Sequence, residues 1–171
     1  MNLFTDCAYE SLNKYGEELC GDKVEFVKGK DFTLAVLADG LGSGVKANIL
    51  STLTSKIIAT MLANGSSLRE AVETIASTLP VCSVRGIAYS TFTIMHVQDN
   101  GNAYIAEFDI PNLVFMRENQ VLELDRQELD IDGKKIYMTK MQMQPNDLMI
   151  AFSDGVVHAG VGCLLDLGWH Y

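Results

Sequence analysis

The helical and strand-like segments of this chain are separated along the sequence, and this separation restricts the folds open to it. Two helices are predicted side by side between residues 45 and 80, and short strands precede and follow them. A parallel sheet would need helices that alternate with strands, a pattern the sequence lacks. The order therefore predicts an α+β fold in which helices pack on antiparallel sheets.

The first predicted helix begins at Val45 and ends at Gly65. Apolar residues recur along it with a spacing of four, which predicts a long buried face made of Ile49, Leu53, Ile57 and Met61, accompanied by Leu50, Ile58 and Leu62. A capping-box pair, Ser67 and Glu70, then starts a second helix that ends at Pro80. Its inward residues are expected to be Leu68, Val72, Ile75 and Leu79.

Strands are predicted at residues 2–9, 23–28 and 31–39 before the helices, and at 89–97 after them. Three turn signals separate the later strands into hairpins: Asn100-Gly101, Glu118-Asn119 and Asp132-Gly133. A final apolar strand, LMIAFSD, ends at Asp154. We expect the whole chain, residues 1–171, to form a single domain large enough to bury its own core.

Composition and charge narrow the class of protein. A formal net charge of -9 disfavours a nucleic-acid partner, because phosphate backbones are bound by clustered Lys and Arg. The first ten residues have no basic stretch typical of a signal peptide, and no apolar run is long enough to span a membrane. Four scattered cysteines without a C-x-x-C pair argue against zinc or thiol redox chemistry. We therefore expect a cytoplasmic protein.

The glycine-rich turn in LAVLADGLGSGVKA, residues 34–47, has two possible functions. It follows a strand and opens a helix, where a dinucleotide-binding fingerprint would lie. However, its glycines follow the spacing G-x-G-x-G rather than G-x-G-x-x-G, and no Gly-Lys-Ser/Thr sequence closes the turn. The spacing therefore disfavours a nucleotide site.

The alternative is a metal site, because three aspartates lie at strand ends beside glycines: Asp22, Asp39 and Asp154. Carboxylates at strand ends can meet at the rim of a sheet, and the carbonyl of Gly40 could add a fourth oxygen ligand. Such an oxygen set suits Mg²⁺ or Mn²⁺ rather than Zn²⁺. Asp-Gly pairs are also ordinary turn formers, so the residues alone leave both interpretations open.

Five segments in order resemble the metal-dependent protein phosphatases, in the bacterial branch typified by stage II sporulation protein E: KYGEELCGD, VLADGLGSGVKA, YSTFTIMHV, AEFDIPNLVFMRENQVLEL and LMIAFSDGV. The resemblance implies an αββα sandwich of two antiparallel sheets flanked by helices. It also implies a centre of two Mn²⁺ or Mg²⁺ ions. The implied reaction is hydrolysis of phosphoserine or phosphothreonine on a protein.

Carried over residue by residue, the resemblance makes Asp39 and Asp154 the catalytic carboxylates. Asp39 would bridge the two metals with the Gly40 carbonyl beside it, Asp154 would bind one metal, and Asp22 would bind directly or through water. The metals would acidify a water for attack on the phosphate, which Arg85 is a candidate to hold. The implied partner is a phosphorylated regulatory protein, such as one of the anti-anti-sigma type.

Two histidines are also candidates, as general acids. They are His96 and His158, and the second is favoured because it lies just after Asp154. A lone histidine is more often structural than catalytic, so neither sequence position decides the matter.

One departure from the family pattern concerns the C-terminal end. The family's last strand carries another metal-binding aspartate, whereas this sequence ends in GVGCLLDLGWHY, where Asp166 does not match that motif. We therefore expect a sandwich that lacks its last strand and pairs as a homodimer through an exposed sheet edge. Two alternatives stay open: a catalytically weak or inactive phosphatase-fold module that binds proteins, and a fragment completed by another chain.

Overall fold

The computed structural model describes residues 2–78 and 90–161, which form two antiparallel sheets and three helices. The α+β class is therefore confirmed. In chain order the elements are β1 (Asp22–Lys28), β2 (Phe32–Gly40), α1 (Gly44–Ala63), α2 (Leu68–Thr78), β3 (Ser90–Gln98), β4 (Asn102–Phe108), β5 (Val114–Arg117), β6 (Gln120–Leu122), β7 (Gln127–Ile131), β8 (Lys134–Gln142), β9 (Leu148–Ile150) and α3 (Asp154–Val157).

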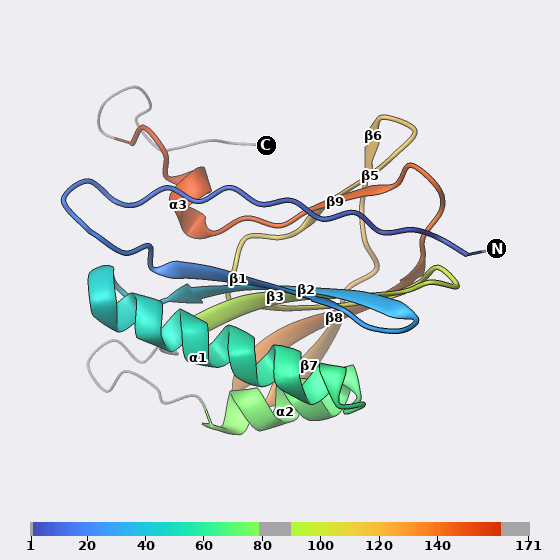
Figure 1. Cartoon of the computed structure of the whole chain (residues 1–171), viewed down its shortest axis with the longest axis horizontal. Coiled ribbons are helices and arrows are strands. Elements are labelled where there is room, and N and C mark those ends of the chain that lie inside the picture. The colour runs from blue at the N-terminus through green and yellow to red at the C-terminus, as the bar shows by residue number, and fades with distance from the viewer. Residues whose placement is uncertain (1, 79–89, 162–171) are drawn as a thin grey trace.

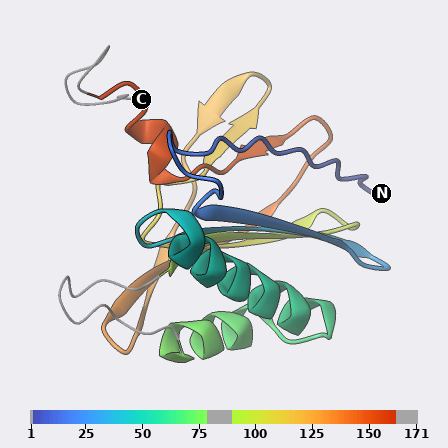
Figure 2. The same cartoon turned by 60° about the vertical axis from the view of Figure 1, so that its left-hand side comes forward.

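The elements are stacked in layers. The larger sheet has the strand order β1-β2-β3-β4-β8-β7, and the smaller has the order β6-β5-β9. Figure 1 shows α1 and α2 on one face of the larger sheet, with the smaller sheet and α3 on the other. The turned view in Figure 2 keeps the same arrangement. None of the described helices combines the length and apolar character that a membrane span requires.

The alternation of side chains along the strands divides the apolar residues between two cores. Along β2, Leu34, Val36 and Ala38 belong to the cluster that α1 and α2 cover. The alternate residues of a strand point to the opposite face, which here looks toward the smaller sheet. A second cluster between the sheets is built around Ile105 and Phe115. Each face of the larger sheet is therefore buried against a different layer.

The predicted buried face of the first helix was wrong in part: Ile58 and Leu62 are buried and Met61 packs against the core, but three other predicted residues are not buried. Ile49, Leu53 and Ile57 are exposed, with 53%, 55% and 41% of their surface accessible. The inward residues of α1 are mostly smaller, and comprise Gly44, Ala47, Ser51, Thr54, Ser55, Ile58, Ala59 and Leu62. A Cβ on Gly40 would lie only 2.8 Å from the Cα of Ala47, so the helix approaches the sheet too closely for large side chains there.

Most local predictions were confirmed. The Ser67 amide donates to the Glu70 carboxylate (2.8 Å), and the Glu70 amide donates to the Ser67 hydroxyl (3.2 Å), as a capping box requires. Leu68, Val72 and Ile75 are buried in α2, while Leu79 and Pro80 lie outside the described residues. Three hairpins, β3–β4, β5–β6 and β7–β8, form at the predicted turns.

Two strand predictions were wrong. Residues 2–9 form no strand, although the Leu3 amide donates to the Asp99 carbonyl at 2.7 Å. A single backbone bond of this kind holds an extended segment without building a ladder. The last strand, β9, is also shorter than predicted, because it ends at Ile150 rather than at Asp154.

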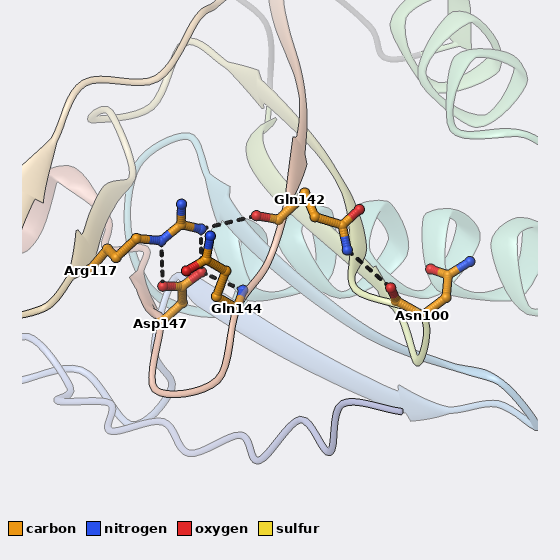
Figure 3. A network of polar contacts seen from close by, with 5 residues as sticks. All are labelled: Asn100, Arg117, Gln142, Gln144 and Asp147. Atoms are coloured by element: carbon orange, nitrogen blue, oxygen red, sulfur yellow. Dashed lines mark hydrogen bonds and ion pairs between the residues drawn. The ribbon is translucent and has the colours of Figure 1, made fainter. Parts of the chain in front are cut away.

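A polar network joins the two sheets at the start of β9 (Figure 3). Arg117 in β5 donates from Nε and Nη2 to both carboxylate oxygens of Asp147, at 2.9 and 2.7 Å. The same Nη2 donates to the Gln142 carbonyl at the end of β8. Asp147 also accepts the Gln144 amide at 2.7 Å, which closes the turn before β9. The network therefore fixes β9 relative to the larger sheet.

We expect Asp147→Asn to destabilise the protein at neutral pH by about 1.5–3 kcal/mol, the usual cost of losing hydrogen bonds to a charged group. The Arg117 guanidinium holds the pKa of Asp147 below 3.8, so this contribution is present above about pH 4 and is lost as pH falls further. Urea melts at pH 7 and pH 3 would measure it. The exposed turn variant Asp132→Asn is the control, and an equal deficit at both pH values would contradict the assignment.

Candidate functional site

Asp22 and Asp39 lie next to each other at one end of the larger sheet. They are register partners in the antiparallel pair of β1 and β2. Because Ala38 belongs to the helix-side core, Asp39 points to the opposite face, toward the smaller sheet. Cross-strand partners share a face, so Asp22 accompanies it. The ladder itself brings the two carboxylates together.

Asp154 comes to this place by a different route from the one predicted. It is the first residue of α3, and three residues separate it from the end of β9. The preceding Ser153 is buried, and its hydroxyl donates to Oδ2 of Asp22 at 2.6 Å. This bond joins the start of α3 to the start of β1. It also explains why Ser153, at the N-cap position, makes no side-chain cap to its own helix.

Steric constraints explain why two positions of the glycine-rich turn are glycine. Gly40 closes β2 against α1, where any Cβ would overlap the carbonyl group of Ala47. Gly42 adopts φ of 101°, in the left-handed region that side chains other than glycine rarely enter. Both glycines are therefore required by the path of the backbone from strand to helix.

Three of the predicted site residues open onto a common cavity of about 270 Å³. They are Asp39, Gly40 and Asp154. Asp22 stands beside Asp39 and is not among the lining residues. The remaining walls are residues that sequence reasoning missed: Leu41, Gly42, Thr91, Asp109, Ile110 and Pro111. Thr91 is the register partner of Asp39, which only the pairing of β2 with β3 reveals.

The charges at this site repel one another. Burial, followed by the negative charges of Asp22 and Asp154, raises the pKa of Asp39 to about 8. Hydrogen bonds to the same two carboxyl groups add to this shift. Among the residues the structure describes, no three acidic, histidine or cysteine side chains lie close enough together to hold an ion as they stand. Without a cation, Asp39 therefore keeps its proton up to about pH 8, and a cation nearby would favour its ionised form.

This donor set fits a hard divalent cation. It consists of carboxylate oxygens and a glycine next to the central aspartate, without a thiolate or imidazole, and such oxygen ligands favour Mg²⁺ or Mn²⁺ over softer metals. A cation at Asp39 would also remove the repulsion that raises its pKa. The oxygen ligands and the raised pKa of Asp39 are thus both consistent with a site for a divalent cation.

The other predicted site residues contribute less to this cavity or cannot be placed. Arg85 and Asp166 lie outside the described residues. His158 is the exposed C-cap of α3 and is not among the cavity residues. His96 packs beside the ring of Phe32, with centroids 4.9 Å apart, and burial lowers its pKa. Its surroundings are those of a structural histidine.

Without metal, we expect Asp39→Asn to be more stable than the wild type at pH 8 but not at pH 3.5. Because the pKa of Asp39 is raised from 3.8 to about 8, the stability this group contributes is complete below pH 4 and is lost as pH rises to 8. Thermal melts in a chelator across this range would measure the difference. Asp132→Asn, an exposed turn aspartate, should follow the wild type, and a pH-independent difference for Asp39→Asn would contradict the coupling.

Comparison with known proteins identifies relatives over most of the chain. The family model described as Stage II sporulation protein E (SpoIIE) matches residues 29–167. Stage II sporulation protein E of Bacillus subtilis (strain 168) is 28% identical over 149 residues, which are 84% of this chain and 18% of that protein. This chain therefore spans less than a fifth of that relative's length.

Solved structures show the same fold. The PP2C phosphatase domain of SpoIIE from Bacillus subtilis, with a fragment of its regulatory domain, has a TM-score of 0.75 at 24% identity, covering 88% of this chain and 45% of that one. RsbX in complex with magnesium has a TM-score of 0.67 at 18% identity, covering 85% of this chain and 71% of that one. The fold is that of PP2C-type phosphatase domains. Since the family match includes β2, the glycine turn and the start of α3, this chain belongs to the stage II sporulation protein E (SpoIIE) family.

Proposed function

We propose that this domain is a metal-dependent protein phosphatase that hydrolyses a phosphoserine or phosphothreonine of a regulatory protein. The observation that carries the proposal is the common cavity of Asp39, Gly40 and Asp154 in a chain of the SpoIIE family. A fold alone does not assign an activity. Here the cavity joins residues from β2, the glycine turn and α3 around a carboxyl group that only a cation would hold ionised at neutral pH, which is the chemistry that a cation-dependent hydrolase requires.

The proposed roles follow from where each residue lies. Asp39 would bridge two Mn²⁺ or Mg²⁺ ions, with the Gly40 carbonyl, Asp154 and Asp22 as further ligands. The bound ions would supply charge neutralisation at the phosphate and a water of lowered pKa. Ser153 holds the Asp22 carboxylate in place through its hydroxyl. Thr91 and the 109–111 segment bound the space in which a phosphorylated side chain would lie.

Three finer points belong to this proposal. They are a cytoplasmic location, a substrate of the anti-anti-sigma type, and the binding of phosphate by Arg85. A cation-stabilised domain that binds a phosphoprotein without hydrolysing it is the alternative function, and the same experiment distinguishes the two.

We expect Mn²⁺-dependent release of phosphate from a phosphoserine protein, and Asp39→Asn should lower kcat/KM by about 100-fold or more. The substitution keeps the size of the side chain but removes the charge proposed to bridge both ions. Phosphate release should be measured alongside thermal melts with and without Mn²⁺. The melting temperature of the wild type should rise with Mn²⁺, and that of Asp39→Asn should rise much less.

Asp132→Asn is the matched control, because it removes one charge from an exposed turn aspartate. A metal-induced rise in melting temperature without hydrolysis would favour the binding alternative. A variant of Asp39 with wild-type turnover would contradict its bridging role.

We also propose that the smaller sheet is a site of self-association. Among the strands described, β9 pairs only with β5, and Leu148 and Ile150 have 50% and 41% of their surface exposed. A strand edge with apolar side chains invites pairing with a second copy. The proposal rests on this edge.

Ile150→Lys should therefore reduce self-association, because a charge on a strand edge opposes pairing. Light scattering at several protein concentrations would measure it, with Thr60→Lys on the exposed surface of α1 as the control. A wild-type protein that is monomeric at every concentration would overturn the expectation.

A further inference from the structure

The segment that follows β4 forms a wall of the candidate cavity. Asp109, Ile110 and Pro111 line it together with the acidic residues Asp39 and Asp154. The sheet explains this position: Asp22, Asp39 and Thr91 are successive register partners across β1, β2 and β3. Residue 109 follows the end of β4, the next strand in the same row. The wall is therefore built at the same end of the sheet as the carboxylates.

A buried ion pair holds this wall in place. Glu107, with 2% of its surface exposed, accepts the Leu113 amide on Oε1 at 2.6 Å and Arg126 Nε on Oε2 at 2.9 Å. Arg126 in turn donates from Nη2 to the Leu113 carbonyl at 3.1 Å. Glu107 therefore holds the Leu113 amide and Arg126 holds the Leu113 carbonyl, so one ion pair fixes both backbone groups. The residues between the end of β4 and Leu113, 109–112, form a loop with both ends anchored.

The buried Glu107–Arg126 pair contributes more to the position of the loop than to the stability of the fold. Burying an ion pair gives little net stabilisation compared with apolar residues of the same volume, whereas it fixes the geometry of the groups it joins. Glu107 shares one face of β4 with Ile105, which is buried between the two sheets, and an apolar side chain would be the ordinary choice there. The Glu107–Arg126 pair is therefore a means of placing the loop.

Asp109 is the charged residue that this loop presents. Its φ of 47° lies in the left-handed region, which aspartate adopts more readily than most residues other than glycine. Its side chain is exposed, and within residues 2–78 and 90–161 it forms no hydrogen bond or ion pair. The charges that act on Asp39 are those of Asp22 and Asp154. Asp109 is thus a separate negative charge on the wall of the cavity.

We propose that the loop 109–112 recognises the substrate, and that Asp109 pairs with a Lys or Arg side chain next to the phosphorylated residue. The inference rests on the proposed phosphatase function and names its substrate class. An unpaired carboxylate beside a phosphate-binding cavity repels the phosphate of any substrate, unless a cation stands between them. A basic side chain on the phosphorylated segment supplies that cation. Glu107 and Arg126 are positioning residues, because they act through the loop.

Affinity for non-hydrolysable peptides tests the inference without depending on turnover. Two phosphonate analogues of a phosphoserine peptide would be compared, identical except for Lys or Gln beside the phosphonate, in saturating Mn²⁺. The wild type should bind the Lys peptide about two- to fivefold more tightly, the range expected of an exposed ion pair. Asp109→Asn should bring this ratio close to one. The ratio should also fall with added salt, because exposed pairs are screened.

The control is Asp132→Asn, which alters another exposed aspartate with positive φ, in the β7–β8 turn away from the cavity. It should keep the wild-type preference for Lys. If Asp109→Asn weakens both peptides equally, Asp109 serves the metal centre or the fold and the inference is overturned. Equal binding of the two peptides by the wild type would overturn it as well.

Arg126→Lys tests the positioning role. Lysine keeps the charge beside Glu107, but its single ammonium group cannot reproduce the planar fork that reaches both Glu107 and Leu113. The Lys preference should fall toward one while the melting temperature stays close to that of the wild type. An unchanged preference would show that the loop does not need this anchor.

Hydrolysis of the corresponding phosphoserine peptides separates this inference from the proposed function. Lys-selective binding without hydrolysis would leave the recognition intact and overturn the phosphatase. Hydrolysis of both peptides at equal kcat/KM would support the phosphatase and overturn the recognition. With both correct, Asp109→Asn should raise KM for the Lys peptide more than it lowers kcat.

Discussion

The rest of this structure depends on how closely α1 approaches the end of β2. Gly40 has no side chain, and the carbonyl group of Ala47 occupies the space where one would lie. This contact draws the helix onto the sheet and requires small residues on its inner face, including Ala47, Ser51 and Ser55. It also requires the tight glycine turn that connects the two elements. The position of Asp39 at the rim of the cavity follows from that turn.

The fold brings together three carboxyl groups whose mutual repulsion destabilises it. Asp22, Asp39 and Asp154 are held near one another by a strand ladder and by the Ser153 hydroxyl, although their charges repel. A protein selected only for stability would avoid such a cluster of carboxylates. Strongly shifted pKa values gather where side chains are arranged for chemistry, and the raised pKa of Asp39 is of this kind.

Local signals in the sequence were sufficient to predict much of the fold. The turn pairs Glu118-Asn119 and Asp132-Gly133 adopt positive φ at both positions, as tight hairpins require, and they determine the antiparallel pairing around them. The three aspartates beside glycines were also visible, because each pairs a metal-binding side chain with a residue that permits close backbone approach. These features depend on neighbours in the sequence.

The features that sequence reasoning missed depend on distant contacts. Apolar spacing wrongly assigned Ile49, Leu53 and Ile57 to the buried face of α1, because periodicity reports hydrophobicity and not the space left between helix and sheet. Arg126 and Glu107 are 19 residues apart, and nothing in the chain between them indicates that they pair. The cavity wall at Asp109 was missed for the same reason, since the pairing of β2 with β3 and of β3 with β4 places it.

The bond from Ser153 to Asp22 spans 131 residues of sequence, which has a consequence for folding. Closing so long a loop costs chain entropy, and contacts of this sequence separation form slowly compared with hairpins and helices. We therefore expect the helix-side core to become ordered while the cavity is still incomplete. On the ribosome, the carboxylates of β1 and β2 would emerge long before α3 could join them. The candidate site would then be among the last parts of this domain to assemble.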